Sequence, residues 1–268
     1  MPHVSSAAVT NTGLRREGNE DAFRERPDLG LYVVADGMGG HAAGEIASEM
    51  AVKLIAKDLG SFKGLDVEEA KERMARSIRS ANAAIFERTL AEHDKRGMGT
   101  TTTALVLFES NRYLIGQVGD SRAYMLRDGV FHQVTKDHSY VQEQVDAGYL
   151  TPEQARTHPY ANVITRCVGA SGEVEPDLFS GTVKAGDVWL MASDGLTGMV
   201  EDDVLAGILK SQGSPERWVD RLVAEANRRG GLDNITCIIV SVDTVSEPAA
   251  SEARQPRNSG ETSAPAGV

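Results

Sequence analysis

Cysteine is scarce in this chain, and its scarcity excludes two classes of protein. Only two of the 268 residues are cysteines, Cys167 and Cys237, and neither belongs to a Cys-x-x-Cys pair. A disulfide-stapled fold needs more cysteines, and a structural zinc site needs clustered thiolates or histidines. We therefore interpret both side chains as reduced thiols of a cytoplasmic protein.

Basic residues are also in deficit. The chain has 28 lysines and arginines against 39 aspartates and glutamates, which gives a formal net charge of −11. An acidic chain lacks the basic surface that holds nucleic-acid backbones regardless of their sequence. We expect no nucleic-acid partner, and an anionic substrate must be attracted by a local feature of the surface.

Long apolar runs are missing as well. No run approaches the roughly 18 residues that a membrane-spanning helix needs. Residues 1–6, MPHVSS, lack the basic and apolar regions of a signal peptide. The composition, 41% hydrophobic and 25% charged, is that of an ordinary globular protein. We expect a cytoplasmic monomer with no membrane span.

The composition changes abruptly after Thr244. Residues 245–268 contain no Leu, Ile, Phe, Tyr or Trp and are rich in Ser, Ala, Pro and Glu. Such a segment cannot bury enough apolar surface to fold. Residues 1–244 show no internal repeat and no Pro- or Ser-rich linker. The sequence therefore predicts one domain over 1–244 and a disordered tail over 245–268.

Strand-length apolar runs recur within this domain, at 31–35, 102–108, 113–118, 122–126, 188–192 and 235–242. Turn-forming segments at 109–112 and 127–129 predict two hairpins, and hence antiparallel pairing. Helical periodicity covers 42–58, 67–92, 138–147, 201–211 and 215–229. Two long helices are expected after one early strand, and two more before the last strand. This order is not the alternation of a parallel sheet, so it predicts an α+β fold with helices outside sheets.

Within 67–92, one helix face is expected to carry the core residues Met74, Ile78, Ala81, Ile85 and Leu90.

Aspartates stand at the ends of several predicted strands. Asp36, Asp120 and Asp194 each close an apolar run, and Asp233 precedes the last one. If neighbouring strands bring these ends to one edge, the like charges cannot all stay ionised without a counter-cation. Oxygen ligands favour Mg²⁺ or Mn²⁺ over zinc. One Asp-Gly after a strand is most often a turn, but four such positions and the acidic segment 19–21 together predict a metal site.

Six short segments follow one another in a fixed order: GLRREGNED (13–21), VVADGMGGHAAGE (33–45), GMGTT (97–101), VGDSR (118–122), LMASDG (190–195) and DNIT (233–236). They resemble the motifs of the PP2C-type (PPM) family of metal-dependent protein serine/threonine phosphatases, in its bacterial form. The resemblance covers about residues 5 to 243. It implies an α/β/β/α sandwich, in which two antiparallel sheets lie face to face between helices, with a metal cluster at one end.

The resemblance also implies which residues hold the metals. Asp36 would bridge two Mn²⁺ or Mg²⁺ ions, the carbonyl of Gly37 would complete one of them, and Asp194 and Asp233 would bind the other. Asp120, together with Asp194, would hold a third and weaker ion. Two such ions can share a water, lower its pKa and direct it at phosphorus.

Other residues receive supporting roles from the same resemblance. Glu20 and Asp21 would support the cluster from a second shell, partly through metal-bound waters. Arg16 would clamp the phosphate, since a guanidinium binds two oxygens at once. His41 is the candidate general acid. In other members this histidine directly follows Asp-Gly, whereas here 38–40 intervene, so a structural role at a helix start is the alternative for His41.

Residues 137–166 resemble the flap of the family, a mobile region beside the metals. The segment is polar, turn-rich and long for a connection. We hypothesise that Asn162 or His158 faces the third metal or the substrate peptide.

The resulting prediction is a hydrolase that removes phosphate from phosphoserine and phosphothreonine in proteins and so reverses bacterial Ser/Thr kinases. Its partners would be phosphorylated proteins, with those kinases as further candidates. The alternative is a catalytically weak, phosphoprotein-binding member of the same fold.

Two other interpretations fit less well. A dinucleotide site at Gly37-x-Gly39-x-x-Ala42 would need Asp58 at a strand tip, but Asp58 ends a helical pattern. A nucleophile elbow at Ser121 would have to open a helix, but an expected strand follows.

Overall fold

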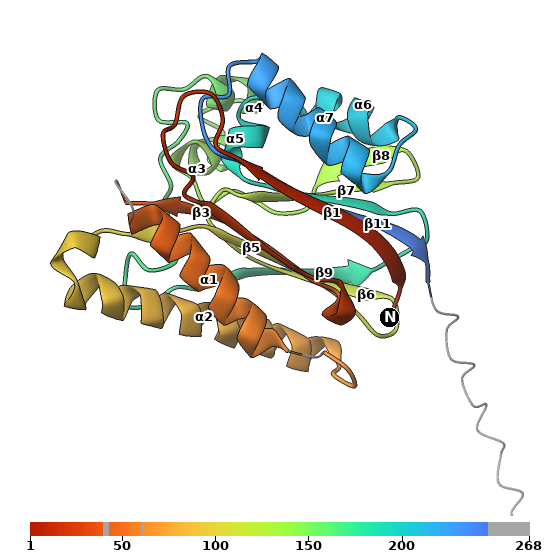
Figure 1. Ribbon diagram of the computed structural model, residues 1–268, viewed down its shortest axis with the longest axis horizontal. Helices are drawn as coiled ribbons and strands as arrows, with labels where there is room; N and C mark the ends of the chain where they lie inside the picture. The colour runs from red at the N-terminus through yellow and green to blue at the C-terminus, as the bar shows by residue number, and fades with distance from the viewer. Residues whose placement is uncertain (40–42, 61, 246–268) are drawn as a thin grey trace, which may run out of the picture.

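The computed structural model describes residues 1–39, 43–60 and 62–245. Its strands form two antiparallel sheets that lie face to face, and helices cover the outer face of each sheet (Figure 1). This arrangement confirms the predicted α/β/β/α sandwich. His41 and nearly all of the predicted tail lie outside the described residues, so both predictions stay open.

The first sheet joins the two ends of the domain. Its strand order is β1 (His3–Asn11), β11 (Ile235–Thr244), β10 (Val188–Ala192), β7 (Arg122–Arg127) and β8 (Val130–Gln133). Its outer face is covered by α5 (Asp194–Thr197), α6 (Asp202–Lys210) and α7 (Pro215–Arg228).

The second sheet is made largely from the first half of the domain. Its order is β2 (Asp21–Arg26), β3 (Leu31–Met38), β5 (Thr102–Phe108), β6 (Arg112–Val118) and β9 (Asp177–Thr182), and the short β4 (Gly99–Thr100) pairs with β3. Its outer face is covered by α1 (Ala43–Leu59) and α2 (Val67–Ala91). Two short 3₁₀ helices, Pro27–Leu29 and His93–Lys95, complete the connections.

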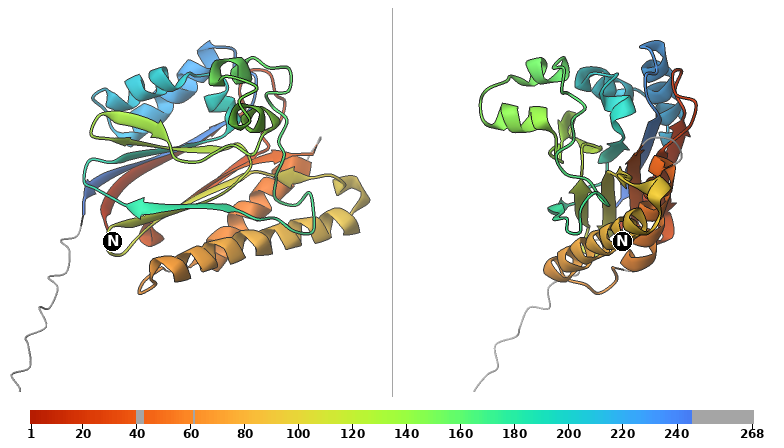
Figure 2. Two further views of the ribbon diagram at one scale, coloured as in Figure 1. Left: turned by 180° about the vertical axis from the view of Figure 1, so that it is seen from behind. Right: turned by 90° about the vertical axis from the view of Figure 1, so that its left-hand side faces the viewer.

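The flap lies between β8 and β9 in the chain and contains two short helices, α3 (Tyr140–Asp146) and α4 (Pro152–Arg156). Figure 2 shows this segment to one side of the sandwich, away from α1 and α2. The flap covers neither outer face of the sheets, and its residues instead form one wall of a surface cavity.

The apolar core has three layers, one between the sheets and one under each set of helices. The central layer contains Trp189, which is fully buried and whose ring centroid lies 4.6 Å from that of Tyr113. Alternation along the strands produces these layers, because successive side chains of a strand point to opposite faces of its sheet.

Both predicted hairpins are confirmed. β5 pairs with β6 around Ser110 and Asn111, and β7 pairs with β8 around Asp128 and Gly129. All four of these residues have positive φ angles, between 52° and 76°. The turn of the first hairpin has three residues, 109–111, and that of the second has two. Short turns with positive φ match the twist of antiparallel strands, which explains why these polar segments join strands.

The predicted helices are also present, with ends that shift by one or two residues. Leu90 does not share the buried face of α2: its side chain is 65% exposed, and Thr89 is buried instead. The spacing explains the error, because Leu90 lies five positions after Ile85 and so leaves the stripe of i+3 and i+4 neighbours.

Several features differ from expectation, among them the short elements β4, β9 and α5, which no segment of the sequence predicted. Three strands, not one, precede α1, since β1 and β2 carry no long apolar run. Asp36 lies inside β3, two residues before its end, because pairing with β4 extends the strand to Met38. α4 was also not expected, although Thr151 and Gln154 form a capping box around Pro152.

The alternatives set aside from the sequence are disfavoured here too. Asp58 lies in the last turn of α1, and Ser121 precedes the strand β7. Cys167 and Cys237 are both free thiols. Within the described part of the chain, every helix is too short or too polar to cross a membrane.

A leucine pair tests the central layer. Replacement of the fully buried Leu105 by alanine is expected to lower the free energy of unfolding by about 2–5 kcal/mol, because the substitution leaves a cavity. The matched change Leu90→Ala, on an exposed side chain, should cost about 0.5 kcal/mol or less. Urea unfolding measures both, and equal losses would contradict the assignment of Leu105 to the core.

Candidate metal centre

The acidic residues predicted from the sequence come from both sheets and meet at one end of the sandwich. Asp21 and Asp36 occupy directly opposite positions on β2 and β3. Asp120 follows β6, Asp194 begins α5 directly after β10, and Asp233 lies two residues before β11. Figure 1 shows that these strand ends lie at the end of the sandwich opposite the N-terminus.

A glycine allows the backbone to crowd beside this cluster. A Cβ atom on Gly37 would lie 2.1 Å from the carbonyl oxygen of Gly44, so only glycine lets β3 approach the start of α1. The N–H of Gly37 donates to the carbonyl of Glu20 at 3.1 Å, and Ser48 Oγ donates to the same carbonyl at 2.6 Å. The segment before β2 is thus held against β3 and α1.

Two buried polar side chains join the sheets at the site. Ser193 Oγ donates to Asp21 Oδ2 at 2.8 Å and accepts from the N–H of Thr236, so it links β10 and β11 to β2. Asn234 accepts from the N–H of Glu20 and donates to the carbonyls of residues 12 and 18. These bonds place the loop that carries Arg16 beside Asp233.

The carboxyl groups raise one another's pKa. Burial raises the pKa of Asp36 well above its ordinary value, and the charges of Asp21 and Asp194 add to the effect. Burial is also the main cause for Asp21, whose pKa rises to about 7, and for Asp120 and Asp194, whose pKa values are raised too. Such a set is unfavourable unless protons or cations neutralise it.

Several carboxylate oxygens have no partner. Oδ1 of Asp21, Oδ1 of Asp120 and Oδ1 of Asp194 are buried and accept no hydrogen bond. Buried acceptors are normally satisfied, so these atoms indicate a missing donor or ion. All are hard oxygen donors, which fit Mg²⁺ or Mn²⁺.

The carboxylates do not yet form a coordination sphere. Among residues 1–39, 43–60 and 62–245, no three His, Cys, Asp or Glu side chains are arranged to hold one ion as they stand. Besides burial, the neighbouring Asp194 is one of the causes that raise the pKa of Asp36, and Asp233 accepts a hydrogen bond from Arg16. The donor set fits the metal in its chemistry, although the side chains do not converge on one point.

Arg16 reaches the edge of the cluster from an exposed position. Its Nη2 donates to Asp233 Oδ2 at 2.6 Å, and this bond is the main reason that the pKa of Arg16 is raised. The predicted phosphate clamp therefore lies next to one of the predicted metal ligands. Glu20 lies nearby, and burial raises its pKa while Arg16 opposes that shift.

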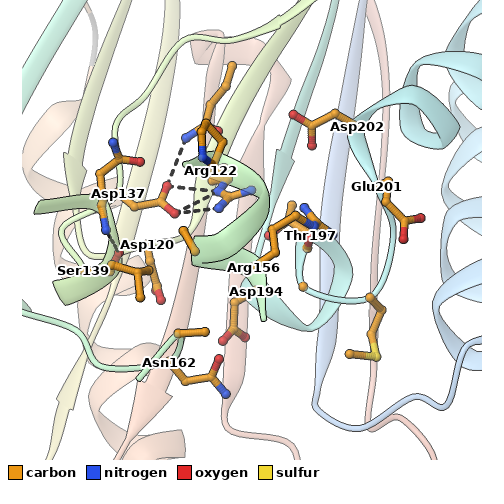
Figure 3. A pocket seen from close by; sticks show the side chains of 18 of the residues that line it. Asp120, Arg122, Asp137, Ser139, Arg156, Asn162, Asp194, Thr197, Glu201 and Asp202 are labelled. Atoms are coloured by element: carbon orange, nitrogen blue, oxygen red, sulfur yellow. Dashed lines mark hydrogen bonds and ion pairs between the residues drawn. The ribbon is translucent and has the colours of Figure 1, made fainter. Parts of the chain in front are cut away.

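A cavity of about 810 Å³ opens beside the carboxylates (Figure 3). Asp120, Asp194 and Asp233 line it on one side, and the flap lines it on another. Asn162 of the flap belongs to its lining. His158 does not, because its ring packs against those of Tyr140 and Tyr160. Of the two flap candidates, only Asn162 faces the space in which a substrate would lie.

Several polar residues at this site have no role that follows from the sequence: Ser193, Asn234, Arg122, Asp137 and His138. The first three lie within two positions of a predicted metal ligand, and the last two begin the flap. What marks these residues is that their hydrogen-bonding side chains are buried beside a charged site. Burial depends on tertiary contacts, so the sequence does not reveal it.

Comparison with known proteins gives a consistent result. The family model described as protein phosphatase 2C matches residues 15–229. The serine/threonine phosphatase stp of Listeria monocytogenes serotype 4b (strain F2365) is 39% identical over 238 residues, which cover 87% of this chain and 94% of that protein. The serine/threonine protein phosphatase PstP of Mycobacterium tuberculosis (strain H37Rv) is 40% identical over 236 residues, 88% of this chain and 44% of that protein.

Solved structures agree in fold. The catalytic domain of PstP, described as a complex with two manganese ions, superposes with a TM-score of 0.81 at 38% identity, over 90% of this chain and 98% of that one. The chain therefore belongs to the protein phosphatase 2C family, as its motifs suggested.

Metal binding is expected to change the stability of the protein in a residue-specific way. At metal concentrations 100-fold above Kd, binding should add about 2.7 kcal/mol, or roughly 5–10 °C in the unfolding midpoint. Asp36→Asn should abolish this increase. At neutral pH it should also stabilise the metal-free protein, because it removes the cost of burying a carboxyl group that would be ionised in the unfolded chain.

The pH dependence follows from the direction of the Asp36 pKa shift. A carboxyl with a raised folded-state pKa costs stability above its unfolded-state value, near 4. The advantage of Asp36→Asn without metal should therefore shrink as the pH falls toward 4. Scanning calorimetry measures both effects, with the exposed Asp220→Asn as control. A wild-type metal response in Asp36→Asn would exclude Asp36 as a ligand.

Proposed function

We propose that this protein hydrolyses phosphoserine and phosphothreonine in other proteins, with Mn²⁺ or Mg²⁺ as cofactor. The observation that carries the proposal is a group of carboxylates with buried, unpartnered oxygens. Two of them, Asp120 and Asp194, line a cavity together with Asp233, which is bonded to the exposed Arg16. Family membership supports it, and so do the relatives, which are named serine/threonine phosphatases.

Each acidic residue receives a role in this proposal. Asp36, the carbonyl of Gly37, Asp194 and Asp233 would hold two ions, and Asp120 would join Asp194 in a third, weaker site. Asp21 and Glu20 would support the cluster from behind. When bound, the metal ions supply a water of lowered pKa as nucleophile and neutralise charge on the phosphoryl group.

Arg16 would bind the phosphoryl oxygens. Its guanidinium is exposed and already hydrogen-bonded to a carboxylate of the cluster, so it can exchange this partner for a phosphate without moving far. A planar guanidinium contacts two oxygens and stabilises the charge of a loose transition state. The acidic protein would in this way attract an anion at one place only.

The cavity would hold the peptide around the phosphorylated residue. Its walls include Asn162 of the flap and the segment from Asp194 to Asp203, so the peptide would lie between the flap and the helices that cover the first sheet. The hydroxyl oxygen that leaves must take up a proton. His41 is the candidate donor, with a structural role as the alternative. Phosphorylated proteins and the kinases that produce them are the partners this activity implies.

A catalytically weak, phosphoprotein-binding member of the family is the alternative function. Such a protein would be expected to lack one of the carboxylates or Arg16. All of them are present, and no observation favours the alternative.

Loss of one ligand should abolish activity. With a phosphothreonine peptide, we expect phosphate release that requires Mn²⁺ or Mg²⁺ and stops with EDTA. Asp194→Ala should lower kcat/KM by about 100-fold or more, which is ~3 kcal/mol of transition-state stabilisation. The exposed Asp220→Ala serves as the matched control. Activity that survives EDTA or Asp194→Ala would rule out the metal mechanism.

Arg16 can be tested against its neighbour. Arg16→Ala should lower kcat/KM by about 10- to 100-fold, because hydrogen bonds to a charged group contribute about 1.5–3 kcal/mol. Arg16→Lys should recover only part of the loss, since lysine keeps the charge but not the planar fork. Arg15→Ala, also exposed, should change little. Equal effects of the two alanine variants would contradict a clamp role for Arg16.

A further inference from the structure

Two consecutive residues at the start of the flap are bonded to residues close to Asp120 in the chain, one directly before it and one two positions after it. Asp137 is bonded to Arg122, and His138 is bonded to Gly119. Asp120 therefore lies in a short turn whose two ends are both held by the flap.

The bond to Arg122 is a partly buried ion pair (Figure 3). Arg122 Nη2 lies 2.7 Å from Asp137 Oδ2, and Nε lies 3.0 Å from both oxygens of the same carboxylate. Gln133 donates to Asp137 Oδ1 at 3.0 Å, and Arg122 Nη1 donates to the hydroxyl of Tyr124. The first residue of the flap is thus fixed to β7 and β8 by several bonds.

The bond to Gly119 runs in both directions. The N–H of Gly119 donates to Nδ1 of His138 at 3.0 Å, and the N–H of His138 donates to the carbonyl of Gly119 at 2.9 Å. Since a backbone N–H can only donate, Nδ1 must be unprotonated. The neutral ring then carries its proton on Nε2, and burial, which lowers the pKa of His138, favours this neutral form.

The other side of the ring faces β9 and the returning end of the flap. Nε2 lies 3.2 Å from Asp177 Oδ2, so its proton can be donated to this carboxylate. Arg166, at the end of the flap, donates to Asp177 Oδ1 at 2.8 Å, and its Nη1 lies 3.0 Å from Nε2. Since a guanidinium can only donate, a ring that carries its proton on Nε2 bonds to Asp177 and not to Arg166. The imidazole is therefore held in one orientation, with Nδ1 directed at Gly119.

The two ends of the flap also meet at His138. The N–H of Thr165 donates to the carbonyl of His138 at 2.9 Å, and the N–H of Tyr140 donates to the carbonyl of Val163 at 2.8 Å. A displacement of His138 would therefore move both ends of the flap together.

The turn itself depends on an unusual backbone. Gly119 has a φ of 104°, and a Cβ atom there would lie 2.6 Å from Thr101 Cγ2. Glycine loses more freedom on folding than other residues. A bond to its N–H is thus well placed to decide where the following side chain, that of Asp120, is directed.

We propose that His138 is a positioning residue, which directs the carboxylate of Asp120 through the N–H of Gly119 and ties the flap to it. The assignment rests on the proposed function, because that function makes Asp120 a metal ligand. Contacts of the substrate with the flap would then influence how well Asp120 holds its ion, and binding of the ion would influence the flap. Both effects would pass through the bond between His138 and Gly119.

Two variants of His138 distinguish the role of Nδ1 from that of Nε2. In His138→Asn, the side-chain oxygen can take the place of Nδ1 and accept from Gly119. In His138→Gln, the amide reaches the place of Nε2 and the bond to Gly119 is lost. The exposed His132→Gln, on β8, is the control for the substitution itself.

The first measurement needs no metal. In ¹⁵N-labelled, metal-free protein, long-range ¹⁵N–¹H spectra of wild type should show His138 as the Nε2–H tautomer. The Gly119 amide proton should resonate downfield in wild type and in His138→Asn, and shift upfield in His138→Gln. The Nδ1–H tautomer in wild type would overturn the proposal, whether or not the variants fold.

The second measurement is the Mg²⁺ dependence of phosphopeptide hydrolysis. In His138→Gln, the Mg²⁺ concentration for half-maximal activity should rise, or kcat should fall, by about 10- to 100-fold, as for other residues that orient metal ligands. His138→Asn should recover most of the loss, and His132→Gln should match wild type. Equal kinetics of His138→Asn and His138→Gln, in folded proteins, would contradict the proposal.

Failure of the proposed function is recognised separately. Wild-type protein without metal-dependent hydrolysis would refute the phosphatase, whereas the tautomer and the Gly119 resonance would still report on the bond. If the wild type is active and the His138 variants have the same Mg²⁺ dependence and kcat as wild type, only the role of His138 is refuted.

Discussion

Mutual repulsion of buried carboxylates is the constraint on which the rest of this structure depends. Asp21, Asp36, Asp120 and Asp194 are all less acidic than ordinary aspartates because each is desolvated, and most lie beside another negative charge. A fold that assembles such a set is destabilised at that place. The sandwich compensates with three apolar layers and with bonds, such as that of Ser193 to Asp21, which hold the two sheets together where their charges repel. Packing of the apolar layers, far from the site, therefore offsets the free-energy cost of the buried carboxylates, as is common for functional sites.

The elements that could be predicted from the sequence are those whose structure is determined by neighbouring residues in the chain. The hairpins at 109–112 and 127–129 and the helices with a clear apolar stripe could be recognised because turn chemistry and periodicity act over a few residues. β1 and β2 could not, since neither has an apolar run, and β1 becomes a strand by pairing with β11 more than two hundred residues away. α4 is a different case, because Thr151, Pro152 and Gln154 do carry a local signal for the start of a helix, but the helix is only five residues long and has no apolar stripe.

The candidate site divides in the same way. Asp36, Asp120, Asp194 and Asp233 could be proposed from their positions at strand ends, and the structure does bring them to one end of the sandwich. Roles for Arg16 and His41 came only from the resemblance to the family. The bond between His138 and Gly119 could not be foreseen, because nothing local in the sequence says that an imidazole from the flap will accept from that N–H.

The pairing of β1 with β11 has a consequence for how the protein is made. Asp36 is synthesised early, but Asp233 and β11 come last, and β11 lies between β1 and β10 in the first sheet. While the chain is still growing on the ribosome, β1 and β10 lack the strand that joins them, and their apolar faces stay uncovered. Contacts this distant in sequence also form slowly. A nascent chain therefore cannot assemble its acidic cluster before β11 emerges, and the carboxylates come together only when synthesis of the domain is complete.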